Sequence, residues 1–513
     1  MPVPYVFANQ TGPIPLSQLD ANFATQASAS EIDYTITGGT VSRTLQAKLF
    51  DVISAGDFGA VGDGVTNNTT ALQNAINYVA FIGGGTLYIP NGSYVTGPLT
   101  LLANVSIVGS GKWSCSFIPS TANEVVFSLV ETANTVVSTV YSDFSINCQS
   151  VTGVQGFQMT LCMHVAMRNL AFIGCSQNFV IDRGWFYDID GCESQGNTSL
   201  KAGSCKIWSS VDTDYVYQVG LRRYSIRNNG AGVQGPVVYV RRGVAVQLFQ
   251  VNCNDANVGG AQTFLQFEND CQGCKAVECG SGAQNYGVLV QTGSGVNVSP
   301  TFLEIIGCDF DQSNDNAIYL NGCSWVKVMA GNITTSSVGT TSAGILVQGA
   351  STNILLHSIV IDGYNGTNGA AVYMNGTGGT GYVELRDNHI DTCYFGLVLA
   401  NSPTNVTGFG NVFKNCTNKL NGSPAGTSSY FANNYGFNPI AVSTPTFPTS
   451  GTNVTNTTGF PVRIFIVGGT FTAVNVNGSS VGNGNVDFYT QLNPGETIAV
   501  TYSSAPTWTW VGL

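Results

Sequence analysis

The sequence predicts an all-β protein organised around a right-handed parallel β-helix, a solenoid in which short strands stack turn upon turn. The first observation is a repeat in which a small residue precedes alternating apolar positions. Its copies begin at Gly287, Ala317, Gly344, Ala371 and Gly396, so the periods are 30, 27, 27 and 25 residues. Self-similarity at such a period is typical of a solenoid. The second observation is that these repeats have no helical pattern, so stacking is the way to bury their apolar side chains.

A second short strand follows each copy and supplies the third observation. Each places one apolar residue between two outward neighbours, as an alternating strand requires. The copies are Asp309–Asp311, Asn332–Thr334, Val360–Asp362, His389–Asp391 and Val412–Lys414. Because equivalent strands stack directly on one another, we expect their outward residues to form columns along the solenoid.

The pattern divides the chain into four parts. Residues 1–50 lack the repeat, and helical spacing in Leu16–Phe23 suggests a short attachment or oligomerisation segment. Residues 51–420 are expected to form the β-helix, and residues 421–440 a linker rich in Asn, Ser, Gly and Pro. Residues 441–513 contain strands separated by Gly and Asn turns, which predicts a small antiparallel sandwich.

Composition excludes several classes of function. Charged residues are only 9% of the chain and the net charge is −11, which argues against nucleic-acid binding. No apolar run reaches the ~18 residues that span a bilayer, and the N-terminus has no basic and apolar export signal. We expect the fourteen cysteines to be buried thiols rather than disulfides. No metal site and no cofactor are expected.

The segment from Asp51 to Gly111 carries a resemblance to a known family. It contains an Asp57-Phe58-Gly59 turn, an amphipathic helix with Leu72, Ala75, Ile76 and Val79 on one face, and the Gly83–Gly85 run before the first strands. This opening resembles that of the pectate-lyase-like β-helix superfamily, in particular the tailspike depolymerases of bacteriophages. A helix placed there would cap the exposed apolar end of the solenoid.

The resemblance implies several properties. The protein would be made in the host cytoplasm and would lie in the virion tail. Its N-terminus would attach to the tail or baseplate, and three copies would form a homotrimer. Its partner would be a bacterial surface polysaccharide, namely capsule, O-antigen or exopolysaccharide.

Acidic residues on the outward column are the candidates for catalysis. Placing the second strands in register predicts that Glu278 and Asp311 are direct neighbours, with Asp309 on the same face. Glycoside hydrolysis needs such a pair, with one carboxyl as acid and the other as base or nucleophile. Two further sets are weighed as runners-up: Asp362 with His389 and Asp391, and Glu268 with Asp270.

Arginine and aromatic residues concentrate on neighbouring turns and are the candidates for substrate binding. Arg227, Arg241 and Arg242 could hold acidic sugars through bidentate contacts, and Trp208 could stack on a sugar ring. The alternative is that these side chains pair with nearby acids or pack within loops.

The predicted function is therefore a polysaccharide depolymerase that hydrolyses its substrate with paired carboxylates. One alternative is a lyase that cleaves a uronate-containing polymer by β-elimination, with Arg or Lys neutralising the carboxylate and His, Tyr or Lys removing the proton. A third possibility, from another class, is a receptor-binding tail fibre that binds glycans without cleaving them.

Overall fold

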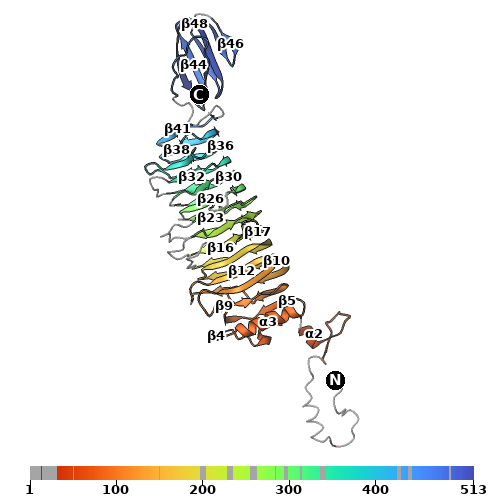
Figure 1. Ribbon diagram of the computed structural model, residues 1–513. Helices are drawn as coiled ribbons and strands as arrows, with labels where there is room; N and C mark the ends of the chain where they lie inside the picture. The colour runs from red at the N-terminus through yellow and green to blue at the C-terminus, as the bar shows by residue number, and fades with distance from the viewer. Residues whose placement is uncertain are drawn as a thin grey trace.

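The structure, a computed structural model, describes residues 13, 32–49, 51–149, 151–196, 204–227, 235–254, 263–282, 285–293, 298–311, 313, 315–335, 342–423, 429–436, 442–483 and 487–513. It is a long parallel β-helix with a helix across its N-terminal end and a small β-domain at its C-terminal end (Figure 1). The predicted fold class is confirmed. The helical spacing at Leu16–Phe23 lies outside the described residues.

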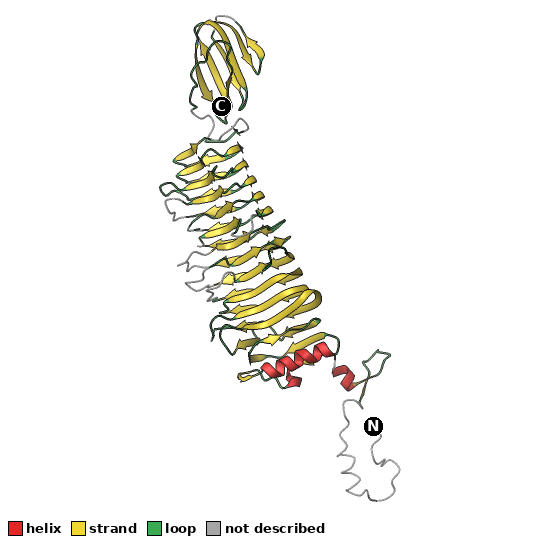
Figure 2. Ribbon diagram, in the orientation of Figure 1, coloured by secondary structure: helices red, strands yellow, loops and turns green. Residues whose placement is uncertain are grey.

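The N-terminal end of the solenoid is closed by a helix, as predicted (Figure 2). Its elements are β1 (Asp33–Tyr34), β2 (Arg43–Thr44), α2 (Leu45–Leu49), the 3-10 helix η1 (Ala55–Phe58) and α3 (Thr69–Phe81). The face of α3 formed by Leu72, Ala75, Ile76 and Val79 is buried against the first strands. Asn68 is buried before α3 and fixes the preceding turn, because its side chain bonds to both the N–H (2.7 Å) and the carbonyl (3.0 Å) of Val61.

Each turn of the solenoid has three strand segments, which stack into what we call the first, middle and third sheets. Three long strands pass through both the first and the middle sheet: β10 (Val125–Ser142), β12 (Gln155–Arg168) and β14 (Gln177–Asp190). The other strands of the first sheet are β7 (Leu99–Thr100), β16 (Cys205–Trp208), β19 (Val238–Arg241), β23 (Thr263–Glu268), β26 (Tyr286–Gln291), β29 (Ile318–Asn321), β32 (Ala343–Gln348), β35 (Ala370–Asn375), β38 (Phe395–Ala400) and β41 (Asn418–Gly422).

The middle and third sheets complete each turn. The middle sheet contains β3 (Ile53–Ser54), β5 (Gly85–Ile89), β8 (Val105–Gly109), β17 (Val216–Arg222), β20 (Gly243–Val244), β21 (Gln247–Phe249), β24 (Lys275–Val277), β27 (Thr301–Ile306), β30 (Ser324–Met329), β33 (Thr352–His357), β36 (Gly381–Arg386), β39 (Thr404–Phe409) and β42 (Tyr430–Ala432). The fourteen strands of the third sheet are β4 (Asp63–Asn67), β6 (Gly92–Thr96), β9 (Cys115–Pro119), β11 (Ser145–Asn147), β13 (Ala171–Ile173), β15 (Glu193–Gln195), β18 (Ser225–Arg227), β22 (Asn252–Asn254), β25 (Gly280–Gly282), β28 (Asp309–Asp311), β31 (Asn332–Thr334), β34 (Val360–Asp362), β37 (His389–Asp391) and β40 (Val412–Lys414).

The small residue that opens each repeat is explained by the core. Gly287 starts the inward column of β26, and a Cβ there would lie 2.5 Å from the ring of Phe310, which comes from the third sheet of the same turn. Any larger residue would displace that ring. The repeat therefore pairs a small residue on the first sheet with a large one on the third.

The predicted register is confirmed over the regular repeats. On the third sheet, Phe310 stacks under Ile333, and the column continues through Ile361, Ile390 and Phe413. All fourteen cysteines are buried and none is in a disulfide, as expected. Among the described helices, none is long and apolar enough to cross a bilayer. The middle sheet was not predicted.

A ladder of buried asparagines runs up the C-terminal turns. Asn388 Nδ2 donates to Asn411 Oδ1 (2.8 Å), and Asn411 Nδ2 donates to Asn434 Oδ1 (2.8 Å). Each amide also donates to a backbone carbonyl one turn below. Asn388 Nδ2 donates to the Leu356 carbonyl (2.9 Å), and Asn411 Nδ2 donates to the Leu385 carbonyl (3.0 Å). Burial of these amides is tolerated because they are hydrogen bonded.

The C-terminal domain is the predicted antiparallel sandwich. Its strands are β43 (Val454–Thr455), β44 (Val462–Val467), β45 (Thr470–Val476), β46 (Ser479–Gly482), β47 (Phe488–Leu492), β48 (Thr497–Ser504) and β49 (Thr507–Gly512), in sheets ordered β43-β48-β45-β46 and β47-β44-β49. Parallel pairing of the solenoid continues to Ala432, past the expected boundary at 420. The ring of Phe431 on the last turn lies 5.3 Å from that of Phe460, which joins the sandwich to the solenoid core.

Candidate functional site

The predicted acids Asp309 and Asp311 lie exposed at the two ends of β28, both pointing outward. Thr334 on the next turn donates a hydrogen bond from its hydroxyl to Asp311 Oδ1 (2.8 Å). On the turn below, Asp309 is opposite Gly280 and Asp311 is opposite Gly282. The two acids therefore share a face with each other but meet no carboxyl from a neighbouring turn.

The predicted proximity of Glu278 and Asp311 is wrong. Glu278 precedes β25 at the corner between the middle and third sheets, where its φ is +52° and its N–H donates to the Ile306 carbonyl (2.9 Å). Its Oε2 accepts a hydrogen bond from Gln250 Nε2 (2.9 Å). The prediction aligned Glu278 with Asp311, whereas Gly282 is the residue opposite Asp311, so the acid was placed four residues out of register.

The runner-up acids Asp362 and Asp391 do lie on neighbouring turns, directly opposite one another in β34 and β37. Adjacent strands are ~4.8 Å apart, so the two carboxyls are neighbours. His389 Nε2 and Lys414 Nζ lie 3.8 Å and 3.4 Å from Asp391 Oδ2. Within the described part of the chain, Asp362 Oδ1 is buried without a hydrogen-bond partner.

The surroundings of Asp391 favour its ionised form. Burial alone would raise its pKa, but hydrogen bonds from Asn415 Nδ2 (2.9 Å) and the Thr392 hydroxyl (3.1 Å), together with the Lys414 ammonium, outweigh burial and lower the pKa below its ordinary value. A hydrogen-bonded carboxylate beside a less well partnered one is an arrangement in which two acids take different roles. The structure thus brings together one predicted cluster and separates the other.

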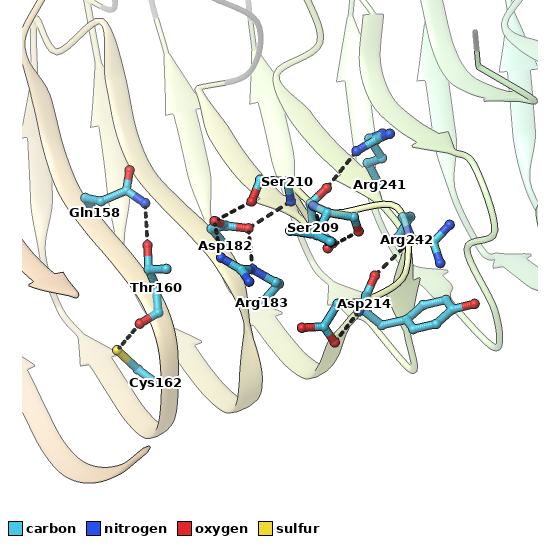
Figure 3. A network of polar contacts seen from close by, with 12 residues as sticks. Gln158, Thr160, Cys162, Asp182, Arg183, Ser209, Ser210, Asp214, Arg241 and Arg242 are labelled. Atoms are coloured by element: carbon cyan, nitrogen blue, oxygen red, sulfur yellow. Dashed lines mark hydrogen bonds and ion pairs between the residues drawn. The ribbon is translucent and has the colours of Figure 1, made fainter. Parts of the chain in front are cut away.

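The predicted binding residue Arg242 is engaged inside the protein. Its guanidinium lies 3.6 Å from Asp270, and their side chains are only 4% and 7% exposed. Arg242 Nε donates to the Asp214 carbonyl (2.9 Å; Figure 3). The Arg242 guanidinium also lies 4.4 Å from the centre of the Tyr215 ring. Tyr215 and Gln272 donate the remaining hydrogen bonds to Asp270. Arg242 and Asp270 therefore form a buried ion pair instead of an open binding or catalytic site.

Arg241 points outward from the first sheet, but it is also paired. It contacts Asp212 at 2.5 Å and donates to the Ser209 carbonyl (2.7 Å; Figure 3). On neighbouring turns it lies between Trp208 and Glu268. The remaining predicted residue, Arg227, belongs to the third sheet and is exposed.

A lysine beside Arg241 was not predicted. Lys206 Nζ lies 3.2 Å from the centre of the Trp208 ring and is directly opposite Tyr239 in the next strand. Burial lowers the pKa of Lys206, outweighing the opposing effect of Asp182. Lys206, Tyr239 and Arg241 are thus the residue types that β-elimination of a uronate requires.

The middle sheet carries a feature that sequence reasoning missed. One position of each turn adopts the left-handed conformation, with φ between 52° and 63° over ten successive turns. The column consists of His164, Phe186, Gln218, Ala245, Gly273, Phe302, Trp325, Asn353, Tyr382 and Asn405. We call it the left-handed column.

The upper half of this column borders a groove with a volume of ≈ 750 Å³. Phe302, Trp325 and Tyr382 are 59%, 54% and 60% exposed, and the rings of Phe302 and Trp325 are near parallel with centres 6.0 Å apart. Glu304 and Lys327 line the groove beside them. We call this surface the aromatic groove.

The lower half of the column borders a second hollow of ≈ 650 Å³. There the rings of His164 and Phe186 are stacked, 4.8 Å apart. Asp188 lies 3.3 Å from Arg168 and 3.6 Å from Arg222. Among the described residues, no group of three or more His, Cys, Asp or Glu is arranged to hold a metal ion.

A signal for the aromatic groove is present in the sequence. The middle strands repeat a small or hydroxyl residue, then an aromatic or Asn, then apolar residues at alternate positions. The copies are Thr301–Ile305, Ser324–Val328, Thr352–Leu356, Gly381–Leu385 and Thr404–Gly408. Asn is the non-glycine residue that best tolerates a left-handed conformation, so its recurrence there could have marked the position.

Comparison with known proteins gives matches of two kinds. The family described as rhamnogalacturonase A/epimerase, pectate lyase-like, matches residues 52–135. Mannuronan C5-epimerase AlgE2 of Azotobacter vinelandii is 48% identical over 63 residues, which is 11% of this chain and 6% of the epimerase. The tail spike protein of Shigella phage Sf6 is 44% identical over 80 residues, covering 14% of this chain and 13% of that protein. Each match spans only a small part of the relative.

The second kind of match covers nearly the whole chain. A mutant tailspike protein of E. coli bacteriophage HK620, solved with a pentasaccharide, aligns with a TM-score of 0.50 and 13% identity over 96% of this chain and 98% of that one. At this identity the likeness concerns the fold. The chain therefore has the parallel β-helix fold, and its residues 52–135 match the pectate-lyase-like family model.

Proposed function

We propose that the protein is a phage tailspike that binds a bacterial surface polysaccharide, whether capsule, O-antigen or exopolysaccharide, and hydrolyses it. The proposal is supported by the match to the Sf6 tail spike, by the HK620 tailspike solved with a pentasaccharide, and by the pectate-lyase-like opening of the solenoid. In this proposal residues 1–50 attach the spike to the virion tail.

The observation that carries hydrolysis is the pair Asp362 and Asp391 on neighbouring turns. Carboxyls about 5 Å apart suit a retaining mechanism. Asp391, kept ionised by Asn415 and Lys414, attacks the anomeric carbon while Asp362 donates a proton to the leaving glycosidic oxygen. Water then displaces Asp391 from the sugar, and Asp362 takes the proton from that water. Both acids end in their starting states.

Asp309 and Asp311 form the second acid set of this proposal. They share one strand and one face, and Thr334 orients Asp311. Glu278 is not part of the set because it lies at a corner, out of register with both. The two sets differ in which positions are sensitive to substitution.

The test compares isosteric amide variants. Asp362→Asn and Asp391→Asn should each lower turnover by about 10² or more, with polymer binding and thermal midpoint retained, because each substitution is isosteric. Release of oligosaccharides from a panel of purified capsules and O-antigens, followed by mass spectrometry, measures turnover. Glu278→Gln is the matched control and should behave as the wild type.

Other outcomes redirect or end the proposal. If Asp311→Asn abolishes turnover and Asp391→Asn does not, the second acid set carries the reaction. If folded variants of all four aspartates cleave normally, hydrolysis on the third sheet is wrong.

A second candidate function is β-elimination on the first sheet. It is favoured by Lys206, whose pKa burial lowers, because a lysine that loses its proton more readily can act as a base. Arg241 would neutralise the uronate carboxylate and Lys206 would take the proton, whereas burial raises the pKa of Tyr239 and makes it a poorer base. Elimination leaves an unsaturated sugar that absorbs ultraviolet light, whereas hydrolysis does not. A rise in absorbance that Lys206→Met abolishes would favour the lyase.

We also propose that the spike is a homotrimer joined in part through its C-terminal sandwich. Its β47-β44-β49 sheet has an outward face on which Phe465, Val467, Tyr489 and Val511 are exposed, which is apolar surface that an assembly would bury. Light scattering should give three times the mass of the chain. A monomer at micromolar concentration would contradict this assembly.

A further inference from the structure

The aromatic groove stores backbone strain at its most exposed residues. A left-handed conformation is unfavourable for a residue with a Cβ, and Gly or Asn occupies it most readily. Here Phe302, Trp325 and Tyr382 occupy it although more than half of each side chain is exposed. Folding gains little from these positions, because large apolar side chains stabilise by being buried.

Strain held at exposed aromatic residues indicates a role outside folding. The left-handed turn swings each side chain out of the sheet, so that the three aromatic side chains border one groove. Asn353 occupies the turn between Trp325 and Tyr382, and Asn405 occupies the turn after Tyr382. The column therefore presents two adjacent aromatic rings, an amide, a third ring and a second amide on five successive turns.

The neighbouring column adds a polar border. It runs through Glu304, Lys327, Leu355, Glu384 and Thr407 on the same five turns. Glu304 is held by Lys275 (2.7 Å) and Lys327 (3.2 Å), so its charge is balanced within the protein. Glu304 and Glu384 are three turns apart, about 14 Å, which is too far for the paired carboxyls of glycoside hydrolysis.

A sugar ring fits this surface. A pyranose has one face of C–H groups, which stacks on an aromatic ring, and a rim of hydroxyls, which bonds to amides and carboxylates. Successive turns rise ~4.8 Å, close to the advance of an extended glycan per sugar. We propose that the aromatic groove is a non-catalytic binding track for a polysaccharide, in which successive pyranose rings lie along the solenoid axis over Phe302, Trp325 and Tyr382.

The track lies on the same turns as the proposed catalytic pair, on a different sheet. Asn353 and Asp362 belong to one turn, and Tyr382 and Asp391 belong to the next. The inference rests on the proposed function only for the identity of the polymer. Binding in the groove and cleavage at the acids are separate properties, so they can be lost separately.

The test replaces the aromatic residues with the residue that the column itself uses. Trp325→Asn and Tyr382→Asn preserve the left-handed turn and remove the stacking surface, so each variant should fold. Binding is measured on an array of purified bacterial capsules and O-antigens, and then by calorimetry on a polymer that the wild type retains. Each substitution should weaken binding about tenfold or more, as for an interface hot spot, and the double variant should weaken it further.

Two comparisons make the result specific. Trp113→Ala removes a tryptophan that is 63% exposed near the N-terminal end, outside the groove, and should leave binding unchanged. Asp391→Asn should retain binding while losing turnover. Wild-type affinity in the folded Trp325→Asn and Tyr382→Asn double variant would overturn the track and leave the proposed function intact. Failure of the wild type to bind any polymer on the array would overturn both.

Discussion

Two regions of this solenoid contain the side chains expected at a sugar-binding site, and they use them in opposite ways. Around Arg241 and Arg242 the arginines and aromatic rings contact one another: Arg242 is buried against Asp270 and Tyr215, and Arg241 contacts Asp212. In the aromatic groove, Phe302, Trp325 and Tyr382 are exposed on strained backbone.

The difference lies in which side chains are available to a ligand. Residue type alone favours the arginine region, because Arg and Trp are the usual partners of acidic sugars. In the structure, Arg241 and Arg242 are paired with acidic residues of the protein itself. The groove has fewer charges, but its aromatic faces contact solvent. Exposure on a strained backbone therefore distinguishes the groove from the arginine region, whereas composition does not.

The largest effect expected from this comparison is on stability. Arg242→Ala leaves the Asp270 carboxylate buried without its cation, and breaking a buried pair in this way costs about 3 kcal/mol or more. We expect the free energy of unfolding to fall by that amount, while the affinity of the folded fraction for polysaccharide is unchanged. Denaturant unfolding and calorimetry measure the two quantities. A stable variant with weaker binding would return Arg242 to the binding residues.

A substitution in the aromatic groove should change the free energy of unfolding in the opposite direction. Trp325→Asn relieves an unfavourable left-handed residue, so its free energy of unfolding should stay level or rise by about 1 kcal/mol. Thermal unfolding of Trp325→Asn, measured together with that of Trp113→Ala, tests this expectation. A clear loss of stability would mean that the Trp325 ring contributes to packing after all.

The smallest effect concerns pH. The hydrogen bond from Lys275, helped by Lys327 and opposed by burial, lowers the pKa of Glu304. A carboxyl with a lowered folded pKa stabilises the fold above its unfolded pKa of ~4.3, and that contribution is lost as pH falls through the folded value. Glu304→Gln should therefore reduce stability slightly at pH 7, by less than about 1 kcal/mol because the pair is partly exposed, and should make no difference near pH 2. Thermal midpoints at the two pH values test this.

The features that could be predicted from the sequence are those whose signal lies within a few neighbouring residues. The third-sheet register from Asp309 to Lys414 was correct because one apolar residue recurs between polar neighbours. The middle sheet was missed because its corners are made by very short connections: only Gly322 and Cys323 separate β29 from β30. The pairing of Arg242 with Asp270, a partner 28 residues away, has no local signal.

The position of Glu278 illustrates a different limit. A solenoid repeat tolerates extra residues at a corner, so the second strand of one turn can begin later in its repeat than the second strand of a neighbouring turn. Cys148 directly follows β11, whereas Cys279 directly precedes β25, so a cysteine in the sequence does not fix the register of this turn. Once the regular repeats begin at residue 309, no further shift occurs, and Asp362 and Asp391 align as expected.

The left-handed column has a consequence for how this surface can vary. Its side chains leave the sheet at a backbone bend that ten turns share, whether the residue is Gly, Asn, Gln or Trp. Changing one of them alters neither the apolar column inside the solenoid nor the hydrogen bonds between turns. The face thus behaves as a row of interchangeable positions on a fixed frame, and its surface chemistry can be changed one turn at a time while the fold stays the same.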